Sequence, residues 1–227
     1  MTNLFLLIFE ALLAFTTVVL VGKFLGKYGL IAWVAIATML ANILTTKSID
    51  VCGISMTMGT TLFASNFLAT DILSEKFSKK DAKTAVYVGL VSSICLIVFT
   101  QIGLRYVPTE FDYVHDSLVT VFSLSLRISI SSIVMYAIAN LADVYIYNKL
   151  KIKMKDKKMW VRNNVATILC NCLENFLFMF GAFVFVFDVK TIMIMALSTS
   201  LIELILGVCD TPFLYWATHF IKGEQNS

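Results

Sequence analysis

Long apolar stretches constrain this chain more than any other feature of its sequence. An α-helix rises 1.5 Å per residue, so about 20 predominantly apolar residues cross the hydrocarbon core of a bilayer. Seven stretches reach or approach this length, and the fifth and seventh exceed it, so these two can tilt, kink or begin as an interfacial helix. The predicted spans are residues 3–22, 28–46, 56–75, 84–103, 118–148, 161–187 and 190–220, with 116–124 as an interfacial lead-in to the fifth.

The composition agrees with an integral membrane protein. Of the 227 residues, 59% are hydrophobic and 15% are charged, with a mean hydropathy of +0.84. A soluble domain averages about 45–50% apolar and roughly 25% charged residues. The length suits one bundle of helices and leaves no separate soluble domain. We therefore predict an all-α polytopic transmembrane helix bundle in which residues 1–227 form a single integral membrane domain.

The first apolar stretch is interpreted as a true helix and not as a cleavable signal. No basic residue precedes it, and Glu10 interrupts it. The alternative is that this helix packs peripherally and that six helices form the working core.

Basic residues gather on one side of the predicted membrane. With seven spans, the loops after the first, third and fifth spans and the C-terminal tail share a side, which the positive-inside rule makes cytoplasmic. The N-terminus is then outside and the C-terminus inside. The basic residues of this side are Lys23, Lys27, Lys76, Lys79, Lys80, Lys83, Lys149, Lys151, Lys153, Lys155, Lys157, Lys158, Arg162 and Lys222, against Lys47, Arg105 and Lys190 on the other.

Polar side chains interrupt four of the predicted spans. A charge at the centre of a bilayer costs about 2.5–3.5 kcal/mol on insertion scales, so such residues usually face a bundle interior or an aqueous cavity. They either mark a substrate pathway or only hold helices together through hydrogen bonds; we favour the first reading for the acids Asp71, Asp143 and Glu174. At helical spacing the polar faces contain Asp71 and Glu75; Tyr136, Asn140 and Asp143; Asn164, Thr167, Asn171, Glu174 and Asn175; and Ser200, Glu203, Gly207 and Asp210, with a bend expected at Pro212 and with Arg127 on another face of its span.

Motifs for catalysis and for metal binding are missing from the sequence. It contains no HExxH, no nucleophile elbow, no phosphate-binding glycine loop and no intramembrane GxGD. The five cysteines are scattered through apolar segments, and Cys170 and Cys172 project from different sides of a helix. The net charge of +3 comes from lysines at helix ends, which gives no indication of nucleic-acid binding. We therefore expect neither an enzyme nor a bound metal or cofactor.

Carboxylates and carboxamides on facing helices suit a particular kind of ligand. They present acceptors and donors in a dry setting, which fits a flat heterocycle rich in N–H groups or a cationic amine. Tyr136, Tyr145, Phe176 and Phe178 are candidates for stacking on such a ring.

Four blocks of sequence resemble the queuosine precursor transporter family, also called the vitamin uptake transporter family. They are NFLATDILSEKFSKKDAKTAV (66–86), RISISSIVMYAIANLADVYIYNKLK (127–151), NCLENFLFMFGAF (171–183) and DTPFLY (210–215), and the match covers most of the chain from Ala41 onward. The resemblance implies an importer of the bacterial inner membrane for deazaguanine bases, which are salvaged into the tRNA nucleoside queuosine.

The resemblance also implies a set of substrate-binding residues. Glu174 stands where relatives often have Asp, and Glu203 stands where many have Lys. The reversed charge at 203 bears on whether the bare base, the aminomethyl base or queuine is carried. The matched polar positions are Asp71, Arg127, Asn140, Asp143, Asn171 and Asp210, to which Glu174 and Glu203 are added.

Roles for these residues follow from the chemistry of a guanine-like base. We expect Asp143, Glu174 or Asp71 to accept hydrogen bonds from the ring N1–H and the exocyclic amine. Asn140, Asn171 or Arg127 would then donate to the ring carbonyl. Energy coupling stays open between passive transport, a proton relay through Glu203 or Asp210, and an ATP-driven module, as does homo-oligomerisation.

Two other functions stay open at this stage. The chain can be the substrate-binding subunit of an energy-coupling-factor transporter, with Ala37 and Ala41 as a docking surface for a partner helix. It can also be a non-transporting membrane scaffold whose polar stripes only hold helices together.

Overall fold

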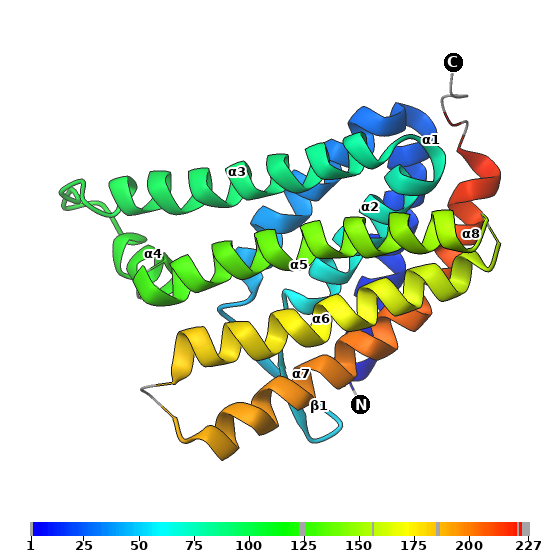
Figure 1. Ribbon diagram of the computed structural model, residues 1–227. Coiled ribbons are helices and arrows are strands. Elements are labelled where there is room, and N and C mark those ends of the chain that lie inside the picture. Colours follow the sequence, from blue (N-terminus) through cyan, green and yellow to red (C-terminus); the bar gives the residue numbers. More distant parts are fainter. Residues whose placement is uncertain (1, 123–125, 156, 185–186, 222, 224–227) are drawn as a thin grey trace.

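The predicted all-α bundle is confirmed, with one small β-hairpin added to it (Figure 1). The computed structural model describes residues 2–122, 126–155, 157–184, 187–221 and 223. The elements in chain order are α1 (Thr2–Leu44), β1 (Ser48–Val51), β2 (Ile54–Thr57), α2 (Thr60–Lys76), α3 (Lys79–Gly103), α4 (His115–Phe122), α5 (Leu126–Lys153), α6 (Met159–Phe183), α7 (Val189–Cys209) and α8 (Thr211–Phe220).

Helix α1 is two helices joined at Gly26. This glycine has φ 61° and ψ −146°, a backbone conformation that residues with a Cβ atom rarely adopt. The chain reverses there, and the second half of α1 packs beside the first (Figure 1). The packing is close, because a Cβ on Gly29 would lie 2.8 Å from the carbonyl oxygen of Val21. The two halves correspond to the predicted spans 3–22 and 28–46.

Helix α2 lies at the centre of the bundle. Every residue from Thr60 to Ser74 except Phe63 is buried, and α2 contacts α1, α3, α5, α7 and α8. Its alanines, serines and threonines allow neighbouring helices to approach closely. The amide of Asn66 donates to the Thr38 hydroxyl at 3.0 Å, and this bond joins α2 to α1. The most polar of the predicted spans is therefore shielded from lipid.

The β-hairpin corrects the predicted start of the third span. Residues 56 and 57 were expected to be helical, but they lie in β2, which pairs antiparallel with β1, Ile49 opposite Met56 and Val51 opposite Ile54. Cys52 and Gly53 both have positive φ, 55° and 84°, as a two-residue hairpin turn requires. This tight turn pairs the two strands, and the helix begins only at Thr60.

The two longest predicted spans are each divided. The lead-in expected at 116–124 is the separate helix α4, and residues 123–125 lie outside the described part of the chain. In the seventh span the break falls at Asp210, which ends α7 and precedes α8, with Pro212 in the first turn of α8. The bend expected from Pro212 is confirmed. Proline is tolerated in a first turn, where its missing N–H has no intrahelical partner.

The pair Ala37 and Ala41 does not form the expected docking surface. Both residues are 0% exposed, because the second half of α1 packs against α2 and α3. These small residues therefore serve packing within the chain, and the prediction that they receive a partner helix is wrong.

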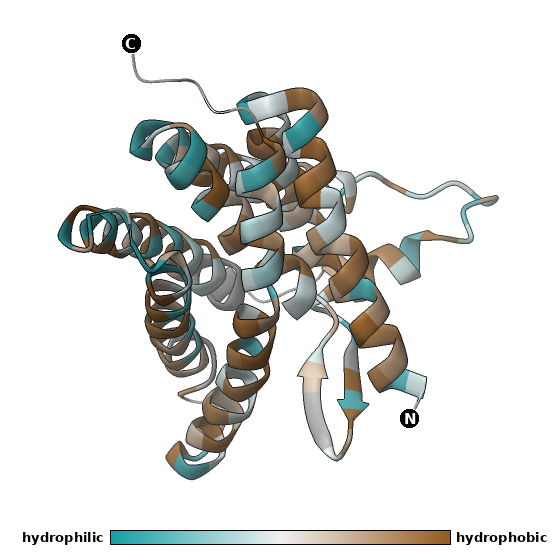
Figure 2. Ribbon diagram, turned by 90° about the vertical axis from the view of Figure 1, so that its right-hand side faces the viewer, coloured by the Kyte–Doolittle hydropathy of each residue, from teal (hydrophilic) through white to brown (hydrophobic). Residues whose placement is uncertain are grey.

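The surface of the bundle matches a hydrocarbon environment. Phe5, Phe24 and Phe99 are exposed by 69%, 73% and 70%, which suits contact with lipid. Figure 2 shows hydrophobic residues along much of the outer helices. Within the described ranges, four helical segments are long and apolar enough to cross a membrane, and the count of seven spans stays a prediction. These segments are Thr2–Leu44, Lys79–Gly103, Met159–Gly181 and Val189–Phe220.

The connections between helices divide into two ends of the bundle (Figure 1). The turn at Gly26, the α2–α3 and α5–α6 connections and the last residues of α8 share one end, which we call the lysine-rich end. The β-hairpin and the α3–α4 and α6–α7 connections share the other, the hairpin end. The loops that the charge pattern assigns to one side of the membrane thus lie at one end of the structure.

The turn at Gly26 provides a first prediction. Gly26→Ala should lower the free energy of unfolding by about 1–3 kcal/mol, because the backbone conformation disfavours a Cβ although no atom lies within 4 Å of it. Unfolding of the detergent-solubilised protein measures this effect. The matched control is Gly103→Ala, which also meets nothing within 4 Å but has a helical backbone, so its stability should not fall. Equal stability of both variants would contradict a constraint at Gly26.

Candidate functional site

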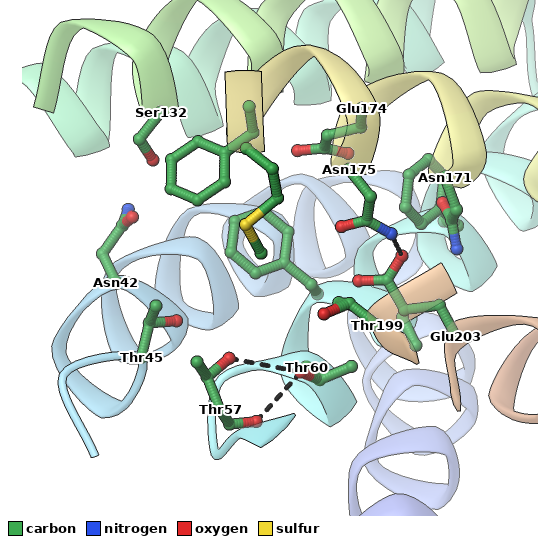
Figure 3. A pocket seen from close by; sticks show the side chains of 15 residues that line it. Asn42, Thr45, Thr57, Thr60, Ser132, Asn171, Glu174, Asn175, Thr199 and Glu203 are labelled. Atoms are coloured by element: carbon green, nitrogen blue, oxygen red, sulfur yellow. Dashed lines mark hydrogen bonds between the residues drawn. The ribbon is translucent and has the colours of Figure 1, made fainter. Parts of the chain in front are cut away.

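A polar cavity opens between α1, α2, α5, α6 and α7 toward the hairpin end (Figure 3). Its position follows from the residues that line it, since Asn42 and Thr45 come at the end of α1 and Ser132 lies near the start of α5. Thr57 and Thr60 flank the start of α2. None of these five residues was predicted as part of the site. Four of them lie near the ends of predicted spans, where a polar residue is usually only solvated, and Ser132 lies inside the fifth predicted span.

One wall of the cavity carries its carboxylates and carboxamides. Asn171 and Glu174 project from α6, and Glu203 projects from α7, so the structure brings together three predicted site residues. The Asn175 amide donates to Glu203 Oε2 at 2.6 Å and to the Ser200 hydroxyl at 3.3 Å. Among the described residues no donor contacts the buried Oδ1 of Asn171. The wall therefore offers acceptors and a donor to a polar ligand.

Aromatic side chains form much of the remaining lining. Phe63 and Phe67 come from α2, and Phe178 comes from α6. Of the four aromatic residues suggested for stacking, Phe178 is the one that lines this cavity. Tyr145 is 52% exposed and lies under the ammonium group of Lys79, 4.8 Å from the ring centroid, so its predicted stacking role is wrong.

A second cluster of polar side chains is buried in the bundle, outside the lining of the cavity. Asp71, Asp143 and Asp210 are each 0% exposed, and the three carboxyl groups lie close enough to interact electrostatically with one another. The Asn163 amide donates to Asp210 at 2.7 Å, whereas neither carboxylate oxygen of Asp71 has a hydrogen-bond partner among the described residues. Six of the eight predicted site residues thus fall into two groups that α6 connects. We call these three aspartates the acid cluster.

Two predicted residues belong to neither group. The amide of Asn140 donates to the carbonyl of Tyr136 in its own helix at 3.0 Å, and its buried Oδ1 has no partner within the described ranges. Arg127 lies in the first turn of α5 at the hairpin end, and its side chain lies outside the described part of the structure.

An ion network joins α2, α5 and α6 at the lysine-rich end. Glu75 Oε2 lies 2.7 Å from the Arg162 guanidinium and 3.5 Å from the Lys151 ammonium. The Tyr147 hydroxyl donates to the same oxygen at 3.1 Å, and Lys151 also donates to the carbonyl of Ser74 at 3.0 Å. The charge pattern placed Arg162 among the loop lysines, but its side chain is 0% exposed. The network links the three helices at this end of the bundle.

This architecture defines a class of protein. The helices present apolar faces outward, and their polar residues surround an internal cavity and a buried acid cluster, as in membrane transporters for small molecules. Residues 57–217 match the family described as "Putative vitamin uptake transporter", and the chain belongs to that family. It is accordingly a multi-pass membrane transporter with a small-molecule substrate, and not an enzyme.

Curated relatives agree with this assignment. A "Probable queuosine precursor transporter" of Bacillus subtilis (strain 168) is 29% identical over 221 residues, which cover 97% of this chain and 96% of the relative. The "Queuosine precursor transporter" of Escherichia coli (strain K12) is 24% identical over 164 residues, covering 69% and 70%. The resemblance identified from the four sequence blocks is confirmed. No solved structure matches the chain significantly.

The ion network provides a second prediction. Glu75→Gln should destabilise the protein by about 3–5 kcal/mol, because it removes the carboxylate charge that lies 2.7 Å from the buried Arg162 guanidinium. Denaturant unfolding in detergent measures the loss. The control is Glu110→Gln, the same change at an exposed loop residue, which should leave stability within about 0.5 kcal/mol. Equal midpoints for the two variants would show that the network contributes nothing.

Proposed function

We propose that this transporter imports queuosine precursors, 7-deazaguanine bases or queuine, for salvage into tRNA queuosine. The names of the relatives from Bacillus subtilis and Escherichia coli support the substrate class. The observation that carries the proposal for this chain is the cavity wall of Asn171, Glu174, Asn175 and Glu203 beside phenylalanine rings.

The chemistry of a 7-deazaguanine base is complementary to that wall. Its ring N1–H and exocyclic amine form a two-donor edge, which a carboxylate such as Glu174 can accept as a pair of charge-assisted hydrogen bonds. The adjacent ring carbonyl is an acceptor, which the amide of Asn171 can satisfy. Phe67 and Phe178 supply apolar faces for the flat ring. One planar ligand thus uses each kind of group that the cavity presents.

The direction of transport follows from the charge pattern and the position of the cavity. The positive-inside rule favours the lysine-rich end as cytoplasmic, with the N-terminus outside and the C-terminus inside. The cavity then faces the outside of the inner membrane, where an imported base first binds. The Glu75–Arg162 network would close the cytoplasmic end until the bound base is released inward.

The acid cluster lies between these two ends of the proposed pathway. A base that leaves the cavity would next bind to Asp71 and Asp143. Alternatively, these two residues would carry a proton that crosses the membrane with the base. In this proposal residues 1–227 act as a single transport domain within the lipid bilayer. No nucleic-acid partner is needed, since salvage into tRNA follows import.

The cavity wall provides a third prediction. Glu174→Gln should reduce uptake roughly tenfold to a hundredfold, because a carboxamide oxygen replaces a charged acceptor for two N–H donors. The assay uses a strain that lacks both queuosine synthesis and its own transporter, and it measures queuosine in tRNA against added precursor. Glu110→Gln in the exposed loop is the control and should transport like the wild type. Wild-type uptake by Glu174→Gln would remove Glu174 from the site.

The acid cluster provides a fourth prediction. Asp143→Asn should also lower uptake by at least about tenfold in the same strain, because an amide replaces a fully buried carboxyl group on the proposed pathway. Membrane abundance of the variant is measured by immunoblot, so that lost insertion is separated from lost transport. If Asp143→Asn and Glu174→Gln both transport normally, the polar residues only hold helices together and the site assignment fails.

A further inference from the structure

The cavity contains two carboxylates where the ring edge of a base needs only one. Glu174 on α6 and Glu203 on α7 both line it, and they interact electrostatically with each other. Among the described lining residues there is no lysine, arginine or histidine. Two like charges in one partly dry cavity repel each other and favour a cation between them.

The two carboxylates differ in how they are held. Asn175 binds Glu203 Oε2 at 2.6 Å and fixes its position on α7, one turn from Ser200. Glu174 accepts no hydrogen bond from the residues that the structure describes, and it lies three residues from Asn171 on the same face of α6. Glu174 and Asn171 are therefore neighbours that can share the donor edge and the carbonyl of one ring. Glu203 faces the cavity from the opposite helix.

We propose that the cavity selects precursors carrying a positive charge, and that Glu203 receives the ammonium group of the substituent while Glu174 binds the ring edge. This inference rests on the proposed function and deepens it. A neutral base forms hydrogen bonds with Glu174 through its ring edge. It brings no cation to compensate the charge of Glu203. A base with a primary or secondary amine on its side chain pairs with both acids, and the complex then carries one negative charge less. The preferred ligand is thus a cationic aminomethyl base and not a neutral nitrile of similar size.

The experiment compares two probes of nearly equal shape. Uptake of 7-aminomethyl-7-deazaguanine and of 7-cyano-7-deazaguanine is measured in the same strain, and the ratio of their initial rates at low concentration is the readout. We expect a ratio of roughly ten or more for the wild type, since one probe offers a charge-assisted hydrogen bond that the other lacks. The exposed-loop variant Glu110→Gln should keep the wild-type ratio.

The two cavity acids should respond differently. Glu203→Gln should bring the ratio close to one, chiefly by lowering uptake of the aminomethyl base. Glu174→Gln should lower uptake of both bases and keep the preference, because both present the same ring edge. Membrane abundance of each variant is measured beside transport, so that a variant that fails to insert is recognised, and Glu203→Asp then tests the same charge with a shorter side chain.

The possible failures are distinguishable. A wild-type ratio near one, or an unchanged ratio in Glu203→Gln, overturns the selection of cations while transport of precursors stands. If the correctly inserted wild type carries neither base, the proposed function itself fails and the inference falls with it.

Discussion

The high free energy of polar groups in hydrocarbon decides where each helix of this protein lies. Helix α2 carries Asn66, Asp71 and Glu75 within 17 residues, and it is surrounded by five other helices. The outer helices can then present leucine, isoleucine and phenylalanine to lipid. The polar residues of α5, α6 and α7, among them Asp143, Asn171 and Ser200, are buried in the interior of the bundle as well. The cavity, the acid cluster and the ion network all follow from that arrangement.

Helix α6 connects these three features. Its polar residues run from Arg162 in the ion network past Asn163 at the acid cluster to Glu174 in the cavity wall. Twelve residues of helix separate the ends of this series, or about 18 Å along the axis. That distance is more than half of a bilayer's hydrocarbon core. A single helix thus contributes polar residues along most of the proposed pathway.

Much of the fold could be predicted from local patterns. The helix positions follow from apolar length, and the break before Pro212 follows from proline chemistry. The hairpin could not be predicted in this way, because its strands are only four residues long and β2 continues into an apolar stretch.

The site was only partly predictable for a different reason. Helical spacing identified Asn171, Glu174 and Glu203 as inward-facing, but spacing within one helix does not show which helices meet. The pairing of Glu75 with Arg162, and the separation of the acid cluster from the cavity, depend on contacts between residues far apart in the chain. Asn42 and Thr45 were missed because helix ends are polar in any membrane protein.

The junction between α7 and α8 at Asp210 is bound by the first turns of α6. Helix α7 ends at Cys209, and α8 begins at Thr211 in a different direction (Figure 1). The predicted single span therefore consists of two helices that meet at Asp210. The Asn163 amide donates a 2.7 Å hydrogen bond to Asp210 at this junction, and the Asn164 amide donates to the Thr211 hydroxyl at 2.8 Å. The start of α6 is therefore hydrogen-bonded to the junction between α7 and α8, within two residues of Arg162 in the ion network.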